Sequence, residues 1–279
     1  MVTGKVTTGT IKQMKAEGKP ITMLTAYDYS MAKIIDEAGI DMILVGDSLG
    51  NVVLGYDSTL PVTMEDMVHH AKAVCRGAQR AMVVTDLPFL SYQVTVEDAV
   101  RNAGRIMKET GSQAVKMEGG REIADSVRAI VNAGIPVCGH MGLTPQHVHQ
   151  LGGFKVQGKD LEAARKMIDD ALAIEKAGAF CLVLEMVPAP LAKIITEKLQ
   201  IPTIGIGAGP HCDGQVLVIN DILALYPRFT PRFVKQFANL HENVTSAVQQ
   251  YRQEVAARTF PGPEHSFSMP EEVLEELKK

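Results

Sequence analysis

Short apolar runs recur along the chain, and amphipathic segments separate them. Each run is almost continuously apolar and is followed by a polar residue, which is typical of a parallel strand covered on both faces. The pattern occurs in eight segments: 21–28, 38–47, 77–86, 110–119, 133–140, 177–185, 202–207 and, more weakly, 216–221. We therefore expect β-strands that alternate with α-helices, as in repeated βα units.

Threonine and glycine mark the expected ends of the helices. Thr63 and Thr95 stand three residues before Asp66 and Asp98, an arrangement close to the capping box of helix N-termini. A glycine stands just before five of the strands, where a helix C-terminus commonly needs the left-handed conformation. We expect a helix to end at each of these glycines: Gly39, Gly77, Gly111, Gly134 and Gly178.

Eight βα units fit most economically into a closed (β/α)8 barrel, the TIM barrel, an α/β fold of about 250 residues. A doubly wound open sheet is the alternative. Polar residues end strand after strand, which suits a barrel whose C-terminal rim carries the active site, whereas an open sheet would gather them at one switch point. No linker or low-complexity tract interrupts the chain. We therefore predict a single barrel domain over residues 1–279.

Further helices are expected at both ends of the chain. Within residues 1–20, the segment 10–18 predicts a short helix that closes the floor of the barrel. Residues 231–258 predict a lengthened eighth helix, and the C-terminal tail, 259–279, predicts a last short helix after Ser268. Because so short a helix is unstable alone, we expect the tail to dock on the barrel or on a neighbouring subunit.

The composition is that of an ordinary globular protein, with 46% apolar and 22% charged residues. With a formal net charge of −4, the chain lacks the excess of positive charge that a nucleic-acid-binding protein needs. No apolar run reaches the roughly 18 residues of a membrane-spanning helix, and the N-terminus has no apolar core of a secretory signal. We therefore expect no nucleic-acid partner, no membrane association and a cytoplasmic location.

Four cysteines, Cys75, Cys138, Cys181 and Cys212, lie far apart and without C-x-x-C spacing. Two of them, Cys138 and Cys181, fall inside apolar runs that predict strands. Free thiols in a reducing cytoplasm therefore explain these cysteines better than disulfides or a zinc site.

A lysine and a glutamate end the fourth predicted strand. Lys116 and Glu118 are two residues apart, so their side chains share one face of the strand, while Val115 and Met117 take the other. Lysine and glutamate are rarely buried unless they are paired or functional. A structural ion pair is one explanation. A catalytic role is favoured because the pair faces the expected barrel mouth.

Three further carboxylates end other strands: Asp47, Asp86 and Glu185. Each alone could be a helix cap, but four carboxylates on one rim repel each other unless positive charge compensates them. Lys116 supplies one charge, and a divalent cation would supply more. Because oxygen ligands suit Mg²⁺, which binds one or two carboxylates directly and keeps several waters, the rim predicts a magnesium site.

Other polar motifs give weaker signals. His140 ends the fifth strand, and its position favours a substrate contact over a purely structural hydrogen bond. His147 and His149 lie in a loop and are better explained as solvated residues or as a subunit contact. The Gly-rich segment 205–215 could cradle a phosphate, but it lacks the lysine of a P-loop and the position of a dinucleotide fingerprint.

A divalent cation that faces a lysine and a free carboxylate suits proton abstraction beside a carbonyl. The cation can chelate the adjacent oxygens of a 2-oxo acid, while a glutamate acts as the base that forms the enolate. The enolate then attacks a one-carbon or aldehyde electrophile, or the reverse reaction cleaves a carbon–carbon bond. The residues alone thus indicate metal-assisted enolate chemistry on a small oxo acid.

Several long motifs closely resemble those of one enzyme family, in the same order from about residue 10 to about residue 267. They are VGDSLG (45–50), DSTLPV (57–62), DLPF (86–89), VKMEGG (115–120), CGHMGLTPQ (138–146), GGFKVQG (152–158), VLEMVP (183–188) and IGIGAGPHCDGQ (204–215). The chain resembles the ketopantoate hydroxymethyltransferase (3-methyl-2-oxobutanoate hydroxymethyltransferase) family of pantothenate biosynthesis. No key acid or lysine of these motifs is replaced.

The resemblance implies a TIM barrel that transfers a hydroxymethyl group from 5,10-methylenetetrahydrofolate to 3-methyl-2-oxobutanoate and forms 2-dehydropantoate. It also implies a homodecamer, and a Gly-rich loop at 207–215 that lines the substrate or folate pocket. The resemblance also implies a role for each matching residue. Asp47, Asp86 and Glu118 would bind Mg²⁺, Glu118 either directly or through water, and Glu185 would be the proton acceptor. The substrate would contact Asp47, Ser48, Asp86, Lys116 and His140.

Three other functions are alternatives. A carbon–carbon lyase or mutase of the isocitrate lyase and phosphoenolpyruvate mutase type also uses Mg²⁺ and 2-oxo acids, but it usually presents a reactive cysteine on a mobile loop. A non-catalytic folate- or oxo-acid-binding protein should have lost the base, whereas Glu185 is present. A phosphate-binding barrel of the aldolase sort would rest on the glycines of 205–209 alone.

Overall fold

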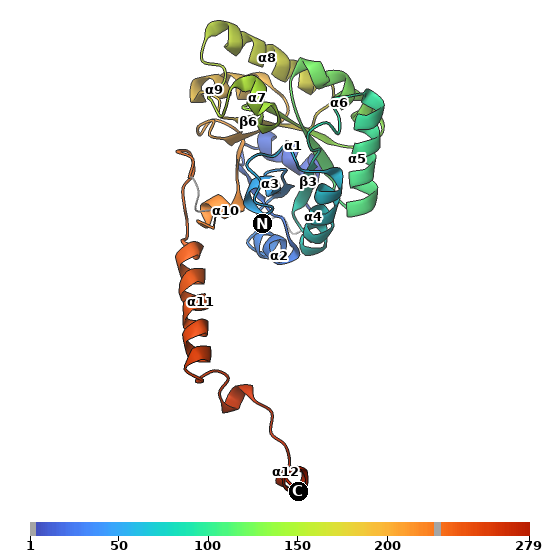
Figure 1. Ribbon diagram of the computed structural model, residues 1–279. Coiled ribbons are helices and arrows are strands. Elements are labelled where there is room, and N and C mark those ends of the chain that lie inside the picture. Colours follow the sequence, from blue (N-terminus) through green and yellow to red (C-terminus); the bar gives the residue numbers. More distant parts are fainter. Residues whose placement is uncertain (1–3, 226–229) are drawn as a thin grey trace.

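A closed barrel of eight parallel strands forms the centre of the protein, and helices surround it (Figure 1). The computed structural model describes residues 4–225 and 230–279. The strands pair in chain order, and β8 pairs with β1 to close the ring. They are β1 (Ile21–Thr25), β2 (Met42–Val45), β3 (Met82–Asp86), β4 (Ala114–Glu118), β5 (Val137–Gly142), β6 (Cys181–Glu185), β7 (Thr203–Ile206) and β8 (Gly214–Leu217). The predicted TIM barrel is confirmed, and the open sheet is excluded.

Helices follow the strands as the alternating pattern predicts. They are α1 (Thr8–Ala16), α2 (Tyr29–Glu37), α3 (Leu49–Val52), α4 (Met64–Gly77), α5 (Val96–Thr110), α6 (Ala124–Asn132), α7 (Val148–Leu151), α8 (Leu161–Lys176), α9 (Ala189–Lys198), α10 (Ile219–Ile222), α11 (Leu240–Ala256) and α12 (Glu271–Leu277). The hydroxyls of Thr63 and Thr95 accept the backbone N–H of Asp66 and Asp98, so both predicted helix starts are confirmed. No helix within the described residues is long and apolar enough to cross a membrane.

Four of the five predicted helix-ending glycines have the left-handed backbone, with φ between 87° and 105°: Gly39, Gly111, Gly134 and Gly178. Gly77 does not: α4 ends at this residue as predicted, but the predicted left-handed conformation is wrong. Gly77 is the last residue of α4, and a Cβ at this position would lie 2.6 Å from the carbonyl oxygen of Tyr29. Glycine is therefore needed here because α2 and α4 approach each other closely.

The N-terminal helix α1 lies under the barrel, against the N-terminal ends of the strands. Ile11 is fully buried in the cluster that fills the barrel interior. Lys15 donates hydrogen bonds to the carbonyl oxygens of Thr196 and Ile201 and to the side chain of Asp213. Ile201 lies just before β7, and Asp213 lies just before β8. These contacts leave the opposite, C-terminal rim as the open end of the barrel.

The C-terminal region departs from the prediction. The last strand, β8, ends at Leu217 rather than near 221, because α10 begins at Ile219. Residues 226–229 lie outside the described residues, and the helix predicted for 231–258 corresponds to α11, which begins only at Leu240. It extends away from the barrel, and none of its residues is buried (Figure 1). The prediction of a lengthened eighth barrel helix is therefore wrong.

An apolar stripe on α11 explains why the sequence predicts a packed helix here. Val244, Val248, Tyr251 and Val255 recur at helical spacing, and all four are exposed in this chain. The last short helix, α12, forms as predicted but lies far from the barrel of its own chain (Figure 1). The tail therefore does not dock on its own barrel, and its docking on a neighbouring subunit stays a prediction.

Apolar and charged residues divide the barrel interior between floor and rim. The lower layers are apolar and include Met23, Met42 and Met82. Further along the strands, on the same inward-facing positions, stand buried polar residues such as Asp86 and Lys116. The alternation of strand side chains thus carries the charged groups to the C-terminal rim, where TIM barrels place their active sites.

Candidate active site

All seven residues singled out in the sequence line one small cavity of about 130 Å³ at the C-terminal rim: Asp47, Ser48, Asp86, Lys116, Glu118, His140 and Glu185. They come from the ends of β2, β3, β4, β5 and β6 or from the residues directly after them. Residues far apart in the sequence therefore meet because the barrel brings successive strand ends together.

The first pair across neighbouring strands is Asp86 with Lys116. The register of β3 and β4 sets these residues opposite each other, and Lys116 Nζ lies 3.2 Å from Asp86 Oδ1. Both side chains are 4% exposed. The ion pair compensates part of the buried negative charge, because a lysine and a carboxylate removed from water each need a partner.

His140 connects the lysine to two glutamates. Its Nδ1 lies 3.0 Å from Lys116 Nζ and 3.3 Å from Glu118 Oε1, and its Nε2 lies 3.1 Å from Glu185 Oε2. Burial and the charge of Lys116 lower the pKa of His140, but Glu118 and Glu185 outweigh them and raise it to about 9. The protonated ring is therefore favoured near neutral pH, and it adds a second positive charge to the site.

Negative charge remains in excess at the corner between β2 and β3. Burial raises the pKa of Asp47 well above its usual range, and the charges of Asp86 and Glu118 raise it further. Burial also raises the pKa of Asp86, although Lys116 opposes this. Asp86 Oδ1 is buried and accepts no well-aligned hydrogen bond, so its partner among the described residues is Lys116 in the ion pair. A cation at this corner would relieve the repulsion between the carboxylates, so the residues fit the predicted magnesium ion.

Only a few side chains could bind a magnesium ion directly at this corner. Among the described residues, no group of three His, Cys, Asp or Glu side chains is arranged so that it could hold a metal ion directly. Mg²⁺ commonly takes only one or two carboxylates and keeps several waters. The residues therefore leave room only for an ion that one or two carboxylates would bind directly.

The turn after β2 places Ser48 beside the acidic corner. Tyr27 and Ser48 share a hydrogen bond of 2.8 Å between their hydroxyls, and the backbone N–H of Asp47 donates to Asp86 Oδ2 at 3.0 Å. A Cβ at Gly46 would lie 2.8 Å from Ser48 Oγ. A larger residue at this position would therefore displace the serine from the cavity wall.

The sequence pattern does not predict several residues in or beside the cavity, among them Thr59, Gln146 and Phe154. The hydroxyl of Thr59 is buried without a hydrogen-bond partner, and Phe154 lines the cavity although its side chain is 62% exposed. Gln146 hydrogen-bonds to two of the active-site carboxylates. All three lie in motifs that carry the family resemblance, but the pattern of strands gives no indication of where loop side chains point.

The Gly-rich segment does not line the cavity. Gly207 and Gly209 face a different hollow near Phe233, outside the barrel and beside β1 and β8. Only Ile206, at the end of β7, reaches the catalytic cavity from this region. Residues 207–215 therefore do not line the small cavity, because the loop turns outward after β7, and their place in a folate pocket stays a prediction.

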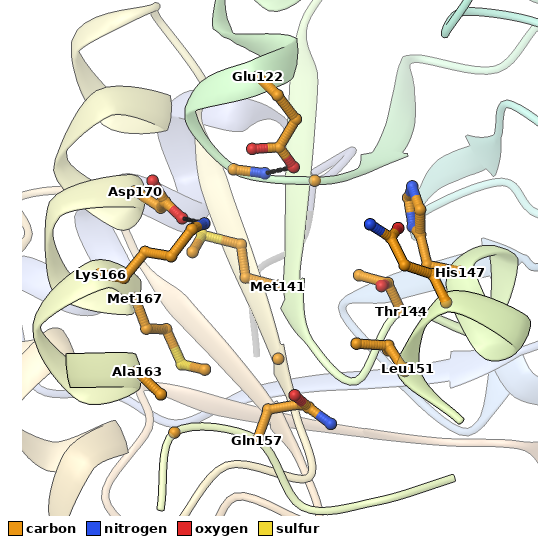
Figure 2. Close-up of a pocket in the computed structure, with 15 residues that line it drawn as sticks. Glu122, Met141, Thr144, His147, Leu151, Gln157, Ala163, Lys166, Met167 and Asp170 are labelled. Carbon is orange, nitrogen blue, oxygen red and sulfur yellow. Dashed lines mark hydrogen bonds and ion pairs between the residues drawn. The ribbon is translucent and has the colours of Figure 1, made fainter. Parts of the chain in front are cut away.

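A larger cavity of about 630 Å³ lies on the other side of β5 (Figure 2). Met141 and His147 line this cavity, and so do Lys166 and Asp170, which form an ion pair one turn apart on α8. None of the seven predicted site residues contributes to it. The seven residues predicted for the active site are thus confined to the smaller cavity.

Replacing Lys116 with Met should destabilise the protein in the absence of metal. The buried carboxylates would lose their nearest positive charge, and breaking a buried ion pair costs about 3 kcal/mol or more. The free energy of unfolding, measured by denaturant titration at neutral pH, should fall by about this amount. Lys108→Met, at an exposed site on α5, serves as the control. Equal stability of the two variants would contradict the charge balance described above.

The fold and the buried cluster of acids and bases at its rim define a TIM-barrel enzyme. The sequence pattern of the ketopantoate hydroxymethyltransferase family matches residues 5–263. The chain therefore belongs to this family and is a transferase of pantothenate biosynthesis.

Close relatives cover almost the whole chain. A 3-methyl-2-oxobutanoate hydroxymethyltransferase of Syntrophus aciditrophicus (strain SB) is 65% identical over 94% of this chain and 97% of its own length. One of Enterococcus faecalis (strain ATCC 700802 / V583) is 59% identical over 98% of this chain and 99% of its own. This similarity shows that the family assignment holds for the barrel and for most of the C-terminal region.

Solved structures share the barrel fold at much lower sequence identity. A phosphonopyruvate hydrolase in complex with oxalate and Mg²⁺ superimposes with a TM-score of 0.57, at 14% identity, covering 97% of this chain and 94% of its own. A 2,3-dimethylmalate lyase gives a TM-score of 0.57 in its triclinic crystal form, at 14% identity over 96% of this chain and 93% of its own. Its trigonal form gives 0.59, at 15% identity over 96% of this chain and 90% of its own. These likenesses support the fold alone.

Proposed function

We propose that this chain transfers a hydroxymethyl group from 5,10-methylenetetrahydrofolate to 3-methyl-2-oxobutanoate and forms 2-dehydropantoate (ketopantoate), the first committed step of pantothenate and coenzyme A biosynthesis. The observation that carries the proposal is the shared cavity of Asp47, Asp86, Lys116, His140 and Glu185 in a member of this family. The cavity joins an acid-rich corner, a lysine and a free carboxylate, which is the set that enolate formation needs.

The cavity has the size and the mixed lining that a small branched oxo acid requires. Its volume of about 130 Å³ suits a molecule of a few carbon atoms. Its charged residues would hold the carboxylate and the oxo group. Its apolar residues would receive the branched alkyl group; they include Leu44, Val183, Ile206 and Val216.

Glu185 is the residue best placed to accept the proton. Its side chain is 15% exposed, against 2–4% for Glu118 and Asp86, so it stands nearest to the open side of the cavity. The contact with His140 Nε2 holds the carboxylate in place. Glu185 would remove the proton from C3 of the oxo acid, while Lys116 and protonated His140 would stabilise the negative charge that moves to the oxygen.

The remaining steps are set by the co-substrate. The enolate carbon would form a bond to the methylene carbon, and a water oxygen would replace the folate nitrogens on that carbon as its hydroxyl. As the two carbon–nitrogen bonds break, the nitrogens would take up two protons, one replacing that removed from C3 and one from the water. Reduced folate is too large for the catalytic cavity, so it would approach from the mouth. The exposed ring of Phe154 stands there and offers an apolar surface.

Asp47 and Asp86 would hold Mg²⁺ directly, and Glu118 would hold it through water. When bound, the ion would supply positive charge that favours the enolate over the neutral oxo acid. Ser48, beside Asp47, would contact the substrate from the same side. The buried Asp86 oxygen that accepts no hydrogen bond and the repulsion that raises the pKa of Asp47 support this assignment.

We also propose a cytoplasmic homo-oligomer, a decamer as the family resemblance implies. The exposed apolar stripe of α11 supports association with other copies, because side chains such as Val248 and Tyr251 are 60% and 59% exposed in the single chain. Apolar surface of this kind on a projecting helix usually marks an interface.

Hydrogen exchange in deuterated water tests the proposed function. With Mg²⁺ and 3-methyl-2-oxobutanoate but no folate, we expect the C3 hydrogen to exchange with solvent, because Glu185 forms the enolate without the co-substrate. Nuclear magnetic resonance of the oxo acid would follow the loss of the C3 proton signal. If no exchange occurs, even with tetrahydrofolate added to complete the site, a lyase or a non-catalytic binding protein becomes the better explanation.

A further inference from the structure

We propose that Gln146 is a positioning residue that fixes two active-site carboxylates, Asp47 and Glu118, and that Tyr92 fixes Gln146. The inference rests on the proposed function in one respect, that these carboxylates serve the cation site. The contacts themselves are independent of it. Gln146 lies in η2 (Pro145–His147), directly after β5, and its side chain is buried.

Gln146 occupies one oxygen of each carboxylate. Its Nε2 donates to Asp47 Oδ2 at 2.8 Å, and its backbone N–H donates to Glu118 Oε2 at 3.0 Å. The second oxygen of Glu118, Oε1, is then left beside His140 Nδ1, at 3.3 Å. Gln146 therefore determines which oxygen of Asp47 and which oxygen of Glu118 remain free to bind a cation or a water. It also links the ends of β2 and β4 through the loop that follows β5.

The amide of Gln146 can take only one orientation. Besides Asp47, its Nε2 donates to the carbonyl oxygen of Leu87 at 3.0 Å. Its Oε1 accepts from the Tyr92 hydroxyl at 2.7 Å and from Gln93 Nε2 at 2.9 Å. A flipped amide would turn its oxygen toward two acceptors and its N–H groups toward two donors. Every hydrogen-bonding position of the side chain is thus used, and each one opposes rotation.

Tyr92 ties this amide to the end of β4. Its side chain is 1% exposed, and its hydroxyl accepts the backbone N–H of Glu118 at 3.0 Å while it donates to Gln146. A single phenol thereby holds the backbone of Glu118 and the side chain of Gln146 at once. Removal of the hydroxyl should loosen the amide without opening a large space in the core.

The test compares Gln146→Leu with Gln150→Leu, an exposed glutamine one turn further along that lacks these contacts. Isothermal titration with Mg²⁺, without substrate, should show that Gln146→Leu binds the ion about 10- to 100-fold more weakly, the usual effect of losing a residue that orients a metal ligand. Gln150→Leu should bind as the unaltered protein does. Binding by Gln146→Leu within twofold of the unaltered protein would overturn the proposal.

A second variant keeps the test decisive if Gln146→Leu does not fold. Tyr92→Phe retains the ring and removes only the hydroxyl, and we expect it to weaken Mg²⁺ binding several-fold while its thermal midpoint without metal changes little. An unchanged affinity in folded Tyr92→Phe would contradict the role of Tyr92. Failure of the proposed function would look different: the unaltered protein would then show no exchange of the oxo-acid hydrogen, whatever the variants bind.

Discussion

Glu185→Gln is expected to lower turnover by about two to four orders of magnitude, the usual effect of removing a general base. Glutamine has nearly the same shape, so the cavity should keep its lining, but an amide cannot take the proton from C3. Mg²⁺ affinity should change little, because Glu185 lies across the cavity from the acidic corner and contacts His140 instead. Steady-state rates of ketopantoate formation would measure the loss, and exchange of the C3 hydrogen should fall in parallel.

The matched control is Glu197→Gln on α9, where the glutamate side chain is 64% exposed and its nearest lysine nitrogen is 3.8 Å away. This variant should retain full turnover. If Glu185→Gln exchanges the C3 hydrogen at nearly the normal rate, another group in the cavity must be the base, and His140 would be the next to test.

Asp86→Asn should weaken Mg²⁺ binding and activity together, by about two to three orders of magnitude, since a bound ion contributes several kcal/mol to such reactions. Asparagine keeps the size of the side chain and can still accept the N–H of Asp47, so the turn after β2 should persist. The loss of one negative charge removes the group that attracts the cation. Calorimetric titration with Mg²⁺ would measure the affinity directly.

Another buried aspartate provides a control for damage to the fold. Asp36 accepts the backbone N–H groups of Gln79, Arg80 and Ala81 far from the cavity. Asp36→Asn should lower the free energy of unfolding by about 1–3 kcal/mol, because buried N–H groups lose a charged acceptor, while it leaves Mg²⁺ affinity unchanged. Equal Mg²⁺ affinities for Asp86→Asn and the unaltered protein would remove Asp86 from the ligand set.

Much of the barrel could be predicted from the sequence because a βα unit is encoded locally. Each apolar run and each helix start depends on residues within one unit, as the caps at Thr63 and Thr95 show. The C-terminal region could not be predicted in the same way. The spacing of Val244 and Val248 indicates an amphipathic helix, but it does not say which surface covers that helix.

The members of the candidate site could also be predicted, but their contacts could not. Strand alternation places Lys116 and Glu118 on one inward face, and the structure agrees. The pairing of Glu118 with His140 depends on the register between β4 and β5, which no local pattern specifies. Gln146 depends on a loop that crosses from β5 to the end of β4, so its place follows from the tertiary fold alone.

The uninterrupted ring of strand pairing has a consequence for the rate of the reaction. Each strand that carries an active-site side chain is hydrogen-bonded on both sides, so the backbone beneath Asp86, His140 and Glu185 cannot shift independently. The charged groups that would meet a developing oxyanion are therefore held in place before a substrate binds. A preorganised environment of this kind spares the reorganisation energy that water would demand at the same step.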